Sequence, residues 1–331
     1  MKRRYDRNWL LEFAGASDAG VNALRHEVEV RVHAPAPFVA RQVPSTALRD
    51  NEAQRIRALQ ALDRLAEDDL LSDEEADALE AVIIPIGRPA LIVEGEDFRR
   101  PVLPALLPVW ERRDALRPAI RASGRIETPG LAPLLPYCGT GFLVTPSLMM
   151  TNRHVVAAGV GRQESGRWTV NEFARPTVDF NACLGAGQPV RASIVGIAYV
   201  HPVEDLALIE IEGENLPQPV PLAATMPSAN ERLCVTIGHP ALDSRCPVPV
   251  QLQVFENVFD VKRLAPGFIL NDNPALGSFE HDCSTLGGNS GSGVFVLDGS
   301  TCGLHHSGTY LVTNWAIALT RLAPALLDIL R

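Results

Sequence analysis

Three segments of the sequence carry residue types that together could perform nucleophilic catalysis. Thr151-Asn-Arg-His154 places a histidine after an apolar run, and Asp205 stands at the start of the apolar segment Asp-Leu-Ala-Leu-Ile. Ser290 lies in the glycine-dense segment Gly-Gly-Asn-Ser-Gly-Ser. A serine hydroxyl is a poor nucleophile until a histidine takes its proton, and a buried carboxylate fixes the histidine tautomer and stabilises the imidazolium. The three segments supply all three residue types that this reaction needs.

The reaction also needs backbone N–H groups directed at the oxyanion that develops on the substrate. Gly287 and Gly288 immediately precede Asn289 and Ser290. Because glycine has no side chain and adopts positive φ without strain, a turn built from these residues can present such donors. The segment therefore suits both a nucleophile and an oxyanion site.

Simpler structural interpretations exist for each of these residues. A serine in a glycine-rich turn and an aspartate before a strand are common turn features, so Ser290 and Asp205 could serve the turns alone. Asp179 and Glu204 are rival acids. Four other histidines after residue 126 do not have the spacing of metal ligands, so we assign them to surface or packing positions and to no catalytic role. They are His201, His239, His281 and His306.

The three motifs, in the order His, Asp, Ser, resemble the chymotrypsin-like (trypsin-fold) serine peptidases, and among them the bacterial glutamyl-endopeptidase branch most closely. The resemblance covers roughly residues 126–331. It implies that Ser290 is the nucleophile, His154 the general base and then acid, and Asp205 the orienting acid, with the amides of Gly288 and Ser290 forming the oxyanion hole. The same order argues against an α/β-hydrolase or a subtilisin fold, which use Ser-Asp-His and Asp-His-Ser.

The resemblance also carries expectations about specificity and activation. Thr285 and His305 match the positions that bind the acidic side chain in glutamyl endopeptidases, which implies a preference for acidic P1 residues. Asn289 stands where many animal members have an aspartate that pairs with a new N-terminus, so activation by cutting at Arg125-Ile126 is not expected. Cys138 occupies a position that often forms a disulfide in the family, but Val155 stands where its partner would be, so we expect no such bridge.

The elements that must position these residues are mainly strands. After residue 126 the sequence consists of short apolar stretches cut by Gly, Pro, Asn and Asp, which is typical of an all-β barrel or sandwich. We expect strands at 141–144, 194–200, 206–211, 233–237, 250–255, 293–297 and 310–312. The resemblance implies two antiparallel six-stranded barrels, with His154 and Asp205 on the first and Ser290 on the second. The apolar spacing of 315–331 predicts a C-terminal helix, kinked or split at Pro324.

The first 120 residues have a different texture. Alternation over 28–32 predicts a strand, and apolar residues every third position over 56–65 predict a helix. A capping-box pattern at Ser72 and Glu75 predicts a second helix, so the two would form a helical hairpin. Prolines recur from 101 to 136, which suits a connector and a boundary near residue 120. We therefore expect a small α-rich region, 1–120, that inhibits, recruits a regulatory protein or braces the peptidase domain, 121–331.

Composition narrows the functional classes. The 331 residues include 30 basic and 39 acidic side chains, and a net charge of −9 opposes non-specific binding to nucleic acid or anionic membranes. No apolar run approaches the roughly 18 residues of a membrane-spanning helix. Six scattered cysteines suggest neither a zinc site nor a disulfide framework, and the first residues do not form a secretory signal peptide. We expect a cytoplasmic bacterial protein without metal or organic cofactor.

The function predicted from the sequence is that of a serine endopeptidase acting on proteins or peptides. Two alternatives belong to other classes. One is a catalytically idle or partner-activated peptidase fold that serves as a binding module, with the N-terminal region recruiting the partner. The other is an esterase that uses the same residues.

Overall fold

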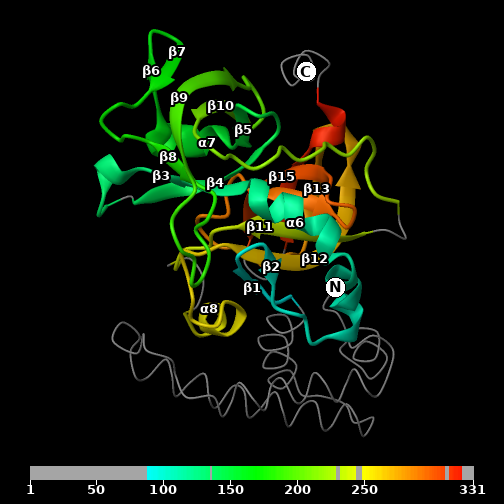
Figure 1. The fold of residues 1–331 in the computed structure, drawn as a ribbon. Coiled ribbons are helices and arrows are strands. Elements are labelled where there is room, and N and C mark those ends of the chain that lie inside the picture. Colours follow the sequence, from blue (N-terminus) through cyan, green and yellow to red (C-terminus); the bar gives the residue numbers. More distant parts are fainter. Residues whose placement is uncertain (1–87, 135, 229–231, 244–247, 310–312, 323–331) are drawn as a thin grey trace, which may run out of the picture. The chain divides into compact units, whose positions relative to one another are not determined.

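The computed structural model of the chain describes residues 88–134, 136–228, 232–243, 248–309 and 313–322 (Figure 1). The predicted strand at 28–32, the helical hairpin at 56–83 and the strand at 310–312 lie outside these residues. By its contacts the chain forms two compact units, and both barrels belong to the larger one, which comprises Ala90–Arg99, Arg112–Ala241 and Phe259–Arg331.

The first barrel contains the strands expected to carry the histidine and the acid. Its six strands close in the order β10-β5-β4-β3-β8-β9, and every pairing is antiparallel. Apolar side chains on its strands, such as Phe142, Met149 and Leu208, are fully buried. The strands are β3 (Ser123–Glu127), β4 (Tyr137–Leu143), β5 (Leu148–Thr151), β8 (Thr177–Asp179), β9 (Arg191–Val200) and β10 (Ala207–Glu212), with a separate hairpin of β6 (Gly161–Glu164) and β7 (Arg167–Val170).

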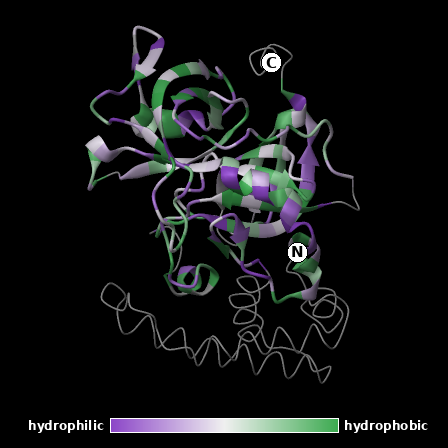
Figure 2. Ribbon diagram, in the orientation of Figure 1, coloured by the Kyte–Doolittle hydropathy of each residue, from purple (hydrophilic) through white to green (hydrophobic). Residues whose placement is uncertain are grey.

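The second barrel has the order β11-β14-β15-β16-β13-β12 and closes through the pairing of β11 with β12. Two short strands, β1 (Leu91–Glu94) and β2 (Asp97–Phe98), extend its sheet beyond β12. Hydrophobic segments lie along strands of both barrels (Figure 2), and β4, β5 and β11 are buried along most of their length. The predicted pair of six-stranded antiparallel barrels is confirmed. The strands are β11 (Leu233–Gly238), β12 (Arg263–Asn273), β13 (Ser278–His281), β14 (Gly293–Val296), β15 (Thr301–Thr309) and β16 (Thr313–Ala318).

Two of the predicted elements are wrong. The stretch expected as a strand at 250–255 lies largely in helix α8 (Val248–Val254), where the buried Gln251 side chain exchanges two hydrogen bonds with the Asp243 main chain, at 2.8 and 2.6 Å. The predicted C-terminal helix fails over its first part. Trp315 lies in β16, whose backbone pairs with both β13 and β15, so sheet pairing overrides the apolar spacing; a 3-10 turn, η5 (Leu319–Arg321), follows.

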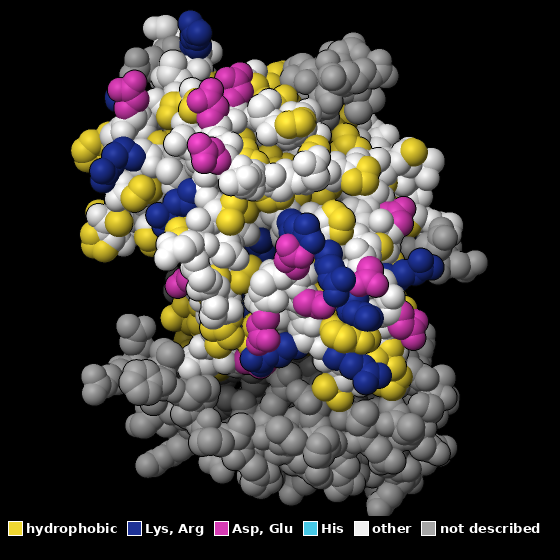
Figure 3. Space-filling view, in the orientation of Figure 1, with side chains coloured by type: hydrophobic (Ala, Val, Ile, Leu, Met, Phe, Trp, Pro, Cys, Tyr) yellow, Lys and Arg dark blue, Asp and Glu magenta, His cyan; other side chains and the backbone are white. Residues whose placement is uncertain are grey.

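The proline-rich segment contains short helices. They are η1 (Pro104–Leu106), α5 (Leu107–Glu111), α6 (Arg113–Ala122) and η2 (Pro129–Leu131), and α6 continues through Pro118. The predicted boundary near residue 120 falls in the last turn of α6. Over α6 and β1–β2 the surface carries mixed charges (Figure 3), among them the ion pairs Arg117–Asp97 at 2.9 Å and Arg121–Glu96. None of the helices in the described part of the chain has the length and apolar character needed to cross a bilayer.

A buried lysine joins α6 to both barrels. Lys262, which directly precedes β12, is 1% exposed, and its Nζ donates hydrogen bonds to the main-chain oxygens of Ile120 and Phe180, each at 2.7 Å. Its own amide donates to Ala182 O at 2.7 Å. Ile120 lies in the last turn of α6, where helical carbonyls lack partners within the helix. Burial lowers the pKa of Lys262 to about 8, against an ordinary value of 10.5.

We expect Lys262→Met to lower the free energy of unfolding by about 1–3 kcal/mol at pH 7, because two buried carbonyls lose their donor. Between pH 8 and 10.5 the unfolded chain holds the lysine proton more tightly than the folded chain, so the wild type gains stability as pH rises through this window. The Met variant lacks this gain, so the difference in free energy of unfolding between the wild type and Lys262→Met should widen as pH rises. Denaturant titrations from pH 7 to 10 measure it, with the exposed Arg99→Met as control; parallel pH profiles for wild type and Lys262→Met would contradict the assignment.

Candidate active site

Strand pairing brings His154 and Asp205 to the same end of the first barrel. β5 ends at Thr151, and the short helix α7 (Arg153–Val155) follows after Asn152. β10 begins at Ala207, directly after the segment with Asp205, and Ala207 pairs with Thr151. Because the two strands are antiparallel, the residue just after β5 and the residue just before β10 must lie side by side.

The Asp205 carboxylate binds His154 with both oxygens. Its Oδ2 lies 2.6 Å from His154 Nδ1, and its Oδ1 accepts the His154 main-chain N–H at 2.9 Å. The Asn152 side chain donates to Asp205 O at 2.8 Å, which fixes the main chain of the acid. A carboxylate at Nδ1 keeps the proton there and leaves Nε2 free to act as a base, as an orienting acid does. The His154 side chain is 48% exposed and can meet a substrate.

The hydrogen bonds from His154 also decide the charge of Asp205. Burial by itself would raise the pKa of this carboxyl group. The bonds from the His154 ring and amide, together with the positive charges that His154 and His306 can carry, outweigh burial and bring the pKa below its ordinary value. Asp205 is therefore an anion at neutral pH.

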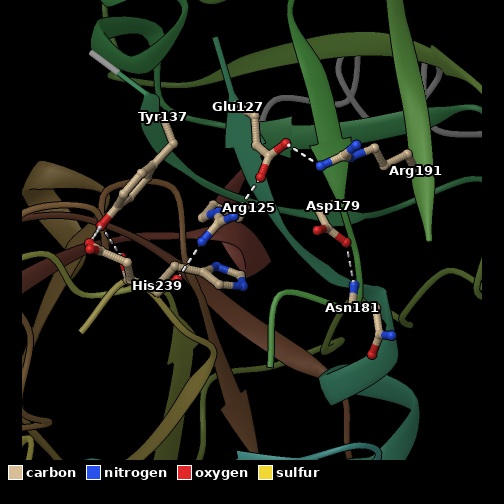
Figure 4. Close-up of polar contacts among 8 residues, drawn as sticks. Arg125, Glu127, Tyr137, Asp179, Asn181, Arg191 and His239 are labelled. Atoms are coloured by element: carbon tan, nitrogen blue, oxygen red, sulfur yellow. Dashed lines mark hydrogen bonds and ion pairs between the residues drawn. The ribbon is translucent and has the colours of Figure 1, made fainter. Parts of the chain in front are cut away.

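The rival acids make other contacts. Asp179 Oδ1 accepts the Asn181 main-chain N–H at 2.8 Å (Figure 4), and the main-chain N–H of Glu204 donates to His201 Nδ1 at 2.8 Å. Among the described residues, Asp205 is the one of these three acids that hydrogen-bonds His154. His201 stabilises the turn that leads to Asp205, which agrees with its assignment to a structural position.

Ser290 lies in a tight turn that is hydrogen-bonded to both barrels. Gly288 and Gly291 on either side have φ angles of +87° and +86°, a conformation that glycine adopts freely. Ser290 O accepts the Thr140 N–H of β4 at 2.9 Å, and Gly291 N donates to His305 O of β15 at 3.1 Å. A Cβ placed on Gly139 would stand 2.8 Å from both Ser290 O and the side chain of Val155, the residue after His154. The serine turn thus lies in the neighbourhood of α7.

The described contacts do not join all three residues of the predicted triad. His154 and Asp205 are hydrogen-bonded, whereas no hydrogen bond within the described residues connects Ser290 Oγ to the His154 ring. In enzymes without substrate, catalytic hydrogen bonds are often long and tighten on binding. The role of Ser290 remains a prediction, which we develop below.

The peptide that would supply one oxyanion donor is fixed in direction. Gly287 O accepts the Ala241 N–H at 2.7 Å. Because a trans peptide places its N–H opposite its C=O, the Gly288 N–H of the same peptide points away from Ala241. This bond restrains the Gly288 amide through the peptide that precedes it.

The two predicted specificity residues have different hydrogen-bond partners. The Thr285 hydroxyl donates to Asn314 Oδ1 at 2.9 Å, and Asn314 Nδ2 donates in turn to Cys283 O at 2.6 Å. His305 is 3% exposed, and its Nδ1 lies 3.2 Å from His281 Nε2. Burial, aided by the charges that His281, His306 and His154 can carry, holds the pKa of His305 well below its ordinary value.

Several polar residues near the site had no role in the sequence interpretation. His306, next to His305 on β15, interacts electrostatically with His154 and Asp205. Burial lowers the pKa of His306, the charge of Asp205 raises it and that of His154 lowers it, and the net effect is a lowered pKa. Thr140 and His239 hold the glycine turn, as described below. Asn152, whose side chain bonds Asp205 O, stands two residues before His154, so its place in the motif was a signal for a role at the site.

The region around Arg125-Ile126 is an intact strand. Both residues lie within β3, which pairs with β4 and β8, and Ile126 is fully buried. Arg125 binds Glu127 and the Asp260 main chain (Figure 4). Cys138 is a free thiol near Thr128. Within the described ranges, no group of three or more His, Cys, Asp or Glu side chains is arranged to hold a metal ion.

We expect Gly291→Ala to destabilise the protein more than Gly166→Ala. Both glycines have φ above +80°, so both variants bear the strain of a positive φ, but the space around Gly166 is open. An alanine Cβ at 291 would stand 2.1 Å from Thr140 O and 2.4 Å from Thr151 Oγ1, which should cost a further 1–3 kcal/mol or so. Thermal unfolding of the two variants measures the difference; equal losses would contradict close packing of the serine turn.

Comparison with known proteins places these features in a family. Residues 139–304, half of the chain, match the model of the trypsin-like peptidase domain. No curated protein sequence matches. Solved structures that align include the serine endoprotease from Yersinia pestis, with 19% identity, a TM-score of 0.46 and 66% of each chain covered. An inactive form of the Mycobacterium tuberculosis protease Rv3671c, its Ser343Ala mutant, aligns with 18% identity, a TM-score of 0.44, and 72% of this chain and 98% of that chain covered.

The chain thus spans slightly less than two thirds of the Yersinia pestis endoprotease. The family match covers the segment from β4 to β15, which holds His154, Asp205 and Ser290. This chain belongs to the family of proteins with a trypsin-like peptidase domain.

Proposed function

We propose that the chain is a serine endopeptidase that cleaves peptide bonds through an acyl-enzyme on Ser290. The observation that supports this most directly is the two-point binding of His154 by Asp205, at 2.6 Å through the ring and 2.9 Å through the main chain. A carboxylate that orients one ring nitrogen of an exposed histidine prepares the other nitrogen for proton transfer.

In the proposed reaction, Ser290 Oγ attacks the carbonyl carbon of the scissile bond while His154 Nε2 takes its proton. The negative charge on the carbonyl oxygen is stabilised by the N–H groups of Gly288 and Ser290. His154 then gives the proton to the leaving amine, and the C–N bond breaks. A water molecule, deprotonated by His154, attacks the acyl-enzyme, and the acid product leaves with Ser290 restored.

One observation favours the alternative of an idle or partner-activated module. The described residues contain no hydrogen bond between Ser290 and His154, so a partner or substrate would have to complete the contact. Under this alternative, the chain alone would not react with reagents that need an activated serine.

Labelling of the full chain with a fluorophosphonate probe tests the proposal. We expect the wild type to be labelled on Ser290 and to cleave an unfolded protein substrate. Ser290→Ala should abolish labelling and lower turnover at least 10⁴-fold, and Asp205→Asn should lower turnover by about 10⁴-fold through loss of the orienting charge. Ser292→Ala, in the same glycine-rich segment, serves as the control and should remain active. A folded wild type that is neither labelled nor active would favour the idle module.

Preference for acidic P1 residues is the finer part of the proposal, and it depends on Thr285 and His305. For Thr285 to bind an acidic side chain, its present hydrogen bond must first break. The single Thr285 hydroxyl proton is directed to Asn314 Oδ1, so it must turn away from Asn314 to bind a carboxylate. His305 is buried with its pKa lowered, so it would act as a neutral donor.

A peptide library that varies P1 measures this preference. If Thr285 and His305 bind an acidic side chain, kcat/KM for P1 Glu should exceed that for Gln, and Thr285→Val should reduce the ratio by about 10-fold, the value of one hydrogen bond to a charged group. Cleavage mainly after basic or large apolar residues would refute acidic preference while leaving the peptidase proposal intact.

A further inference from the structure

Thr140 of β4 holds both ends of the segment that would form the oxyanion hole. Its main-chain N–H donates to Ser290 O at 2.9 Å, and its hydroxyl donates to Gly288 O at 2.8 Å. Thr140 is fully buried, so neither bond competes with water. A residue of the first barrel thereby fixes the carbonyls of both residues whose amides would face the substrate oxygen.

The hydroxyl bond adds a second restraint on Gly288, because the Ala241 bond holds only the peptide that precedes this glycine. Glycine has two soft backbone angles and no side chain to restrict them, and here φ is +87°. The peptide before Gly288 is held by Ala241, through Gly287 O at 2.7 Å, and the peptide after it is held by the Thr140 hydroxyl. With both flanking peptides fixed, the direction of the Gly288 N–H is fixed as well.

His239 determines where the Thr140 hydroxyl proton points. The His239 amide donates to Thr140 Oγ1 at 3.2 Å, and His239 Nδ1 also lies 3.2 Å from that oxygen. The hydroxyl has one proton, which goes to Gly288 O, so Nδ1 must be the donor in its own contact. Two donors on the lone pairs of Oγ1 leave its proton directed at Gly288. The Tyr137 hydroxyl, 3.3 Å from His239 O, contacts the same main chain (Figure 4).

The surroundings keep the His239 ring neutral. The residue is fully buried, and burial, reinforced by the positive charges of Lys262 and Arg125, holds the pKa of His239 well below its ordinary value. Its Nε2 has no hydrogen-bond partner among the described residues. A proton on Nε2 would be a buried donor without an acceptor, whereas a proton on Nδ1 is donated to Thr140 Oγ1, so the Nδ1–H tautomer is the stable form.

We propose that Thr140 is a positioning residue for the oxyanion-binding amide of Gly288, with His239 orienting its hydroxyl. The inference rests on the proposed function, because the Gly288 amide acquires its role only if Ser290 is acylated. Thr140 does not touch the substrate; it acts through the glycine turn.

The test compares Thr140→Val with Thr140→Ser in the full chain. Both keep the main-chain bond to Ser290, and Ser keeps the hydroxyl that Val lacks. Removing an oxyanion donor costs about 10²–10³ in kcat, so misdirecting one should cost less, and we expect Thr140→Val to lower kcat about 10–100-fold with KM within about 3-fold. Thr140→Ser should stay within about 3-fold of the wild type in both constants.

A second measurement separates positioning from general loss of structure. A peptidyl boronic acid forms an adduct on the serine that places an oxygen on the oxyanion donors, whereas the cleaved peptide product does not. Thr140→Val should lose boronate affinity by the same factor as kcat and keep the product affinity of the wild type. A similar loss for both ligands would indicate a structural role and overturn the inference.

The remaining outcomes are equally decisive. An active wild type with Thr140→Val unchanged, or with Thr140→Ser impaired as much as Thr140→Val, overturns the inference and leaves the proposed function standing. A wild type that neither cleaves peptides nor reacts with the fluorophosphonate overturns the proposed function and this inference with it.

Discussion

The hydrogen bond from Thr140 N–H to Ser290 O joins the two barrels at the point where the chemistry would occur. His154 and Asp205 belong to one barrel and Ser290 to the other, so the distance between the proposed base and the proposed nucleophile depends on contacts between barrels rather than within them. Reacting groups must be held to within a fraction of an ångström to be effective. Few elements can provide such precision across an interface, and here one buried strand residue does so with its main chain and its side chain.

The contacts between barrels share a chemical character. Tyr137 of the first barrel donates to Asp260, Lys262 donates to Phe180, and Thr140 donates to Gly288. In most of these bonds a buried side chain satisfies a main-chain oxygen. Because an unsatisfied buried carbonyl is costly, a shift of one barrel against the other would break several such bonds at once. The interface therefore has a defined position and not a continuum of positions.

The sequence predicts the fold class and those site residues that lie in short motifs beside strands. His154 and Asp205 meet because each flanks a strand and the two strands pair, and the fold class follows from short apolar stretches. Thr140 and His239 could not be found in this way, because a buried threonine and histidine look like ordinary core residues until their partners across the interface are known. The same limit applies to the segment 250–255, whose alternating pattern fits a strand, but which lies largely in helix α8, where Gln251 bonds the Asp243 main chain.

The burial of Lys262 has a consequence for chemical probing of the molecule. Lys262 and Lys2 are the only lysines among the 331 residues, although the chain has 30 basic side chains. With its ammonium group enclosed between α6 and the barrels, Lys262 is out of reach of acylating reagents in the folded state. Its rate of acylation therefore reports how often α6 or the barrels move apart enough to admit a small molecule. Acylation of this single residue therefore detects opening of the folded protein.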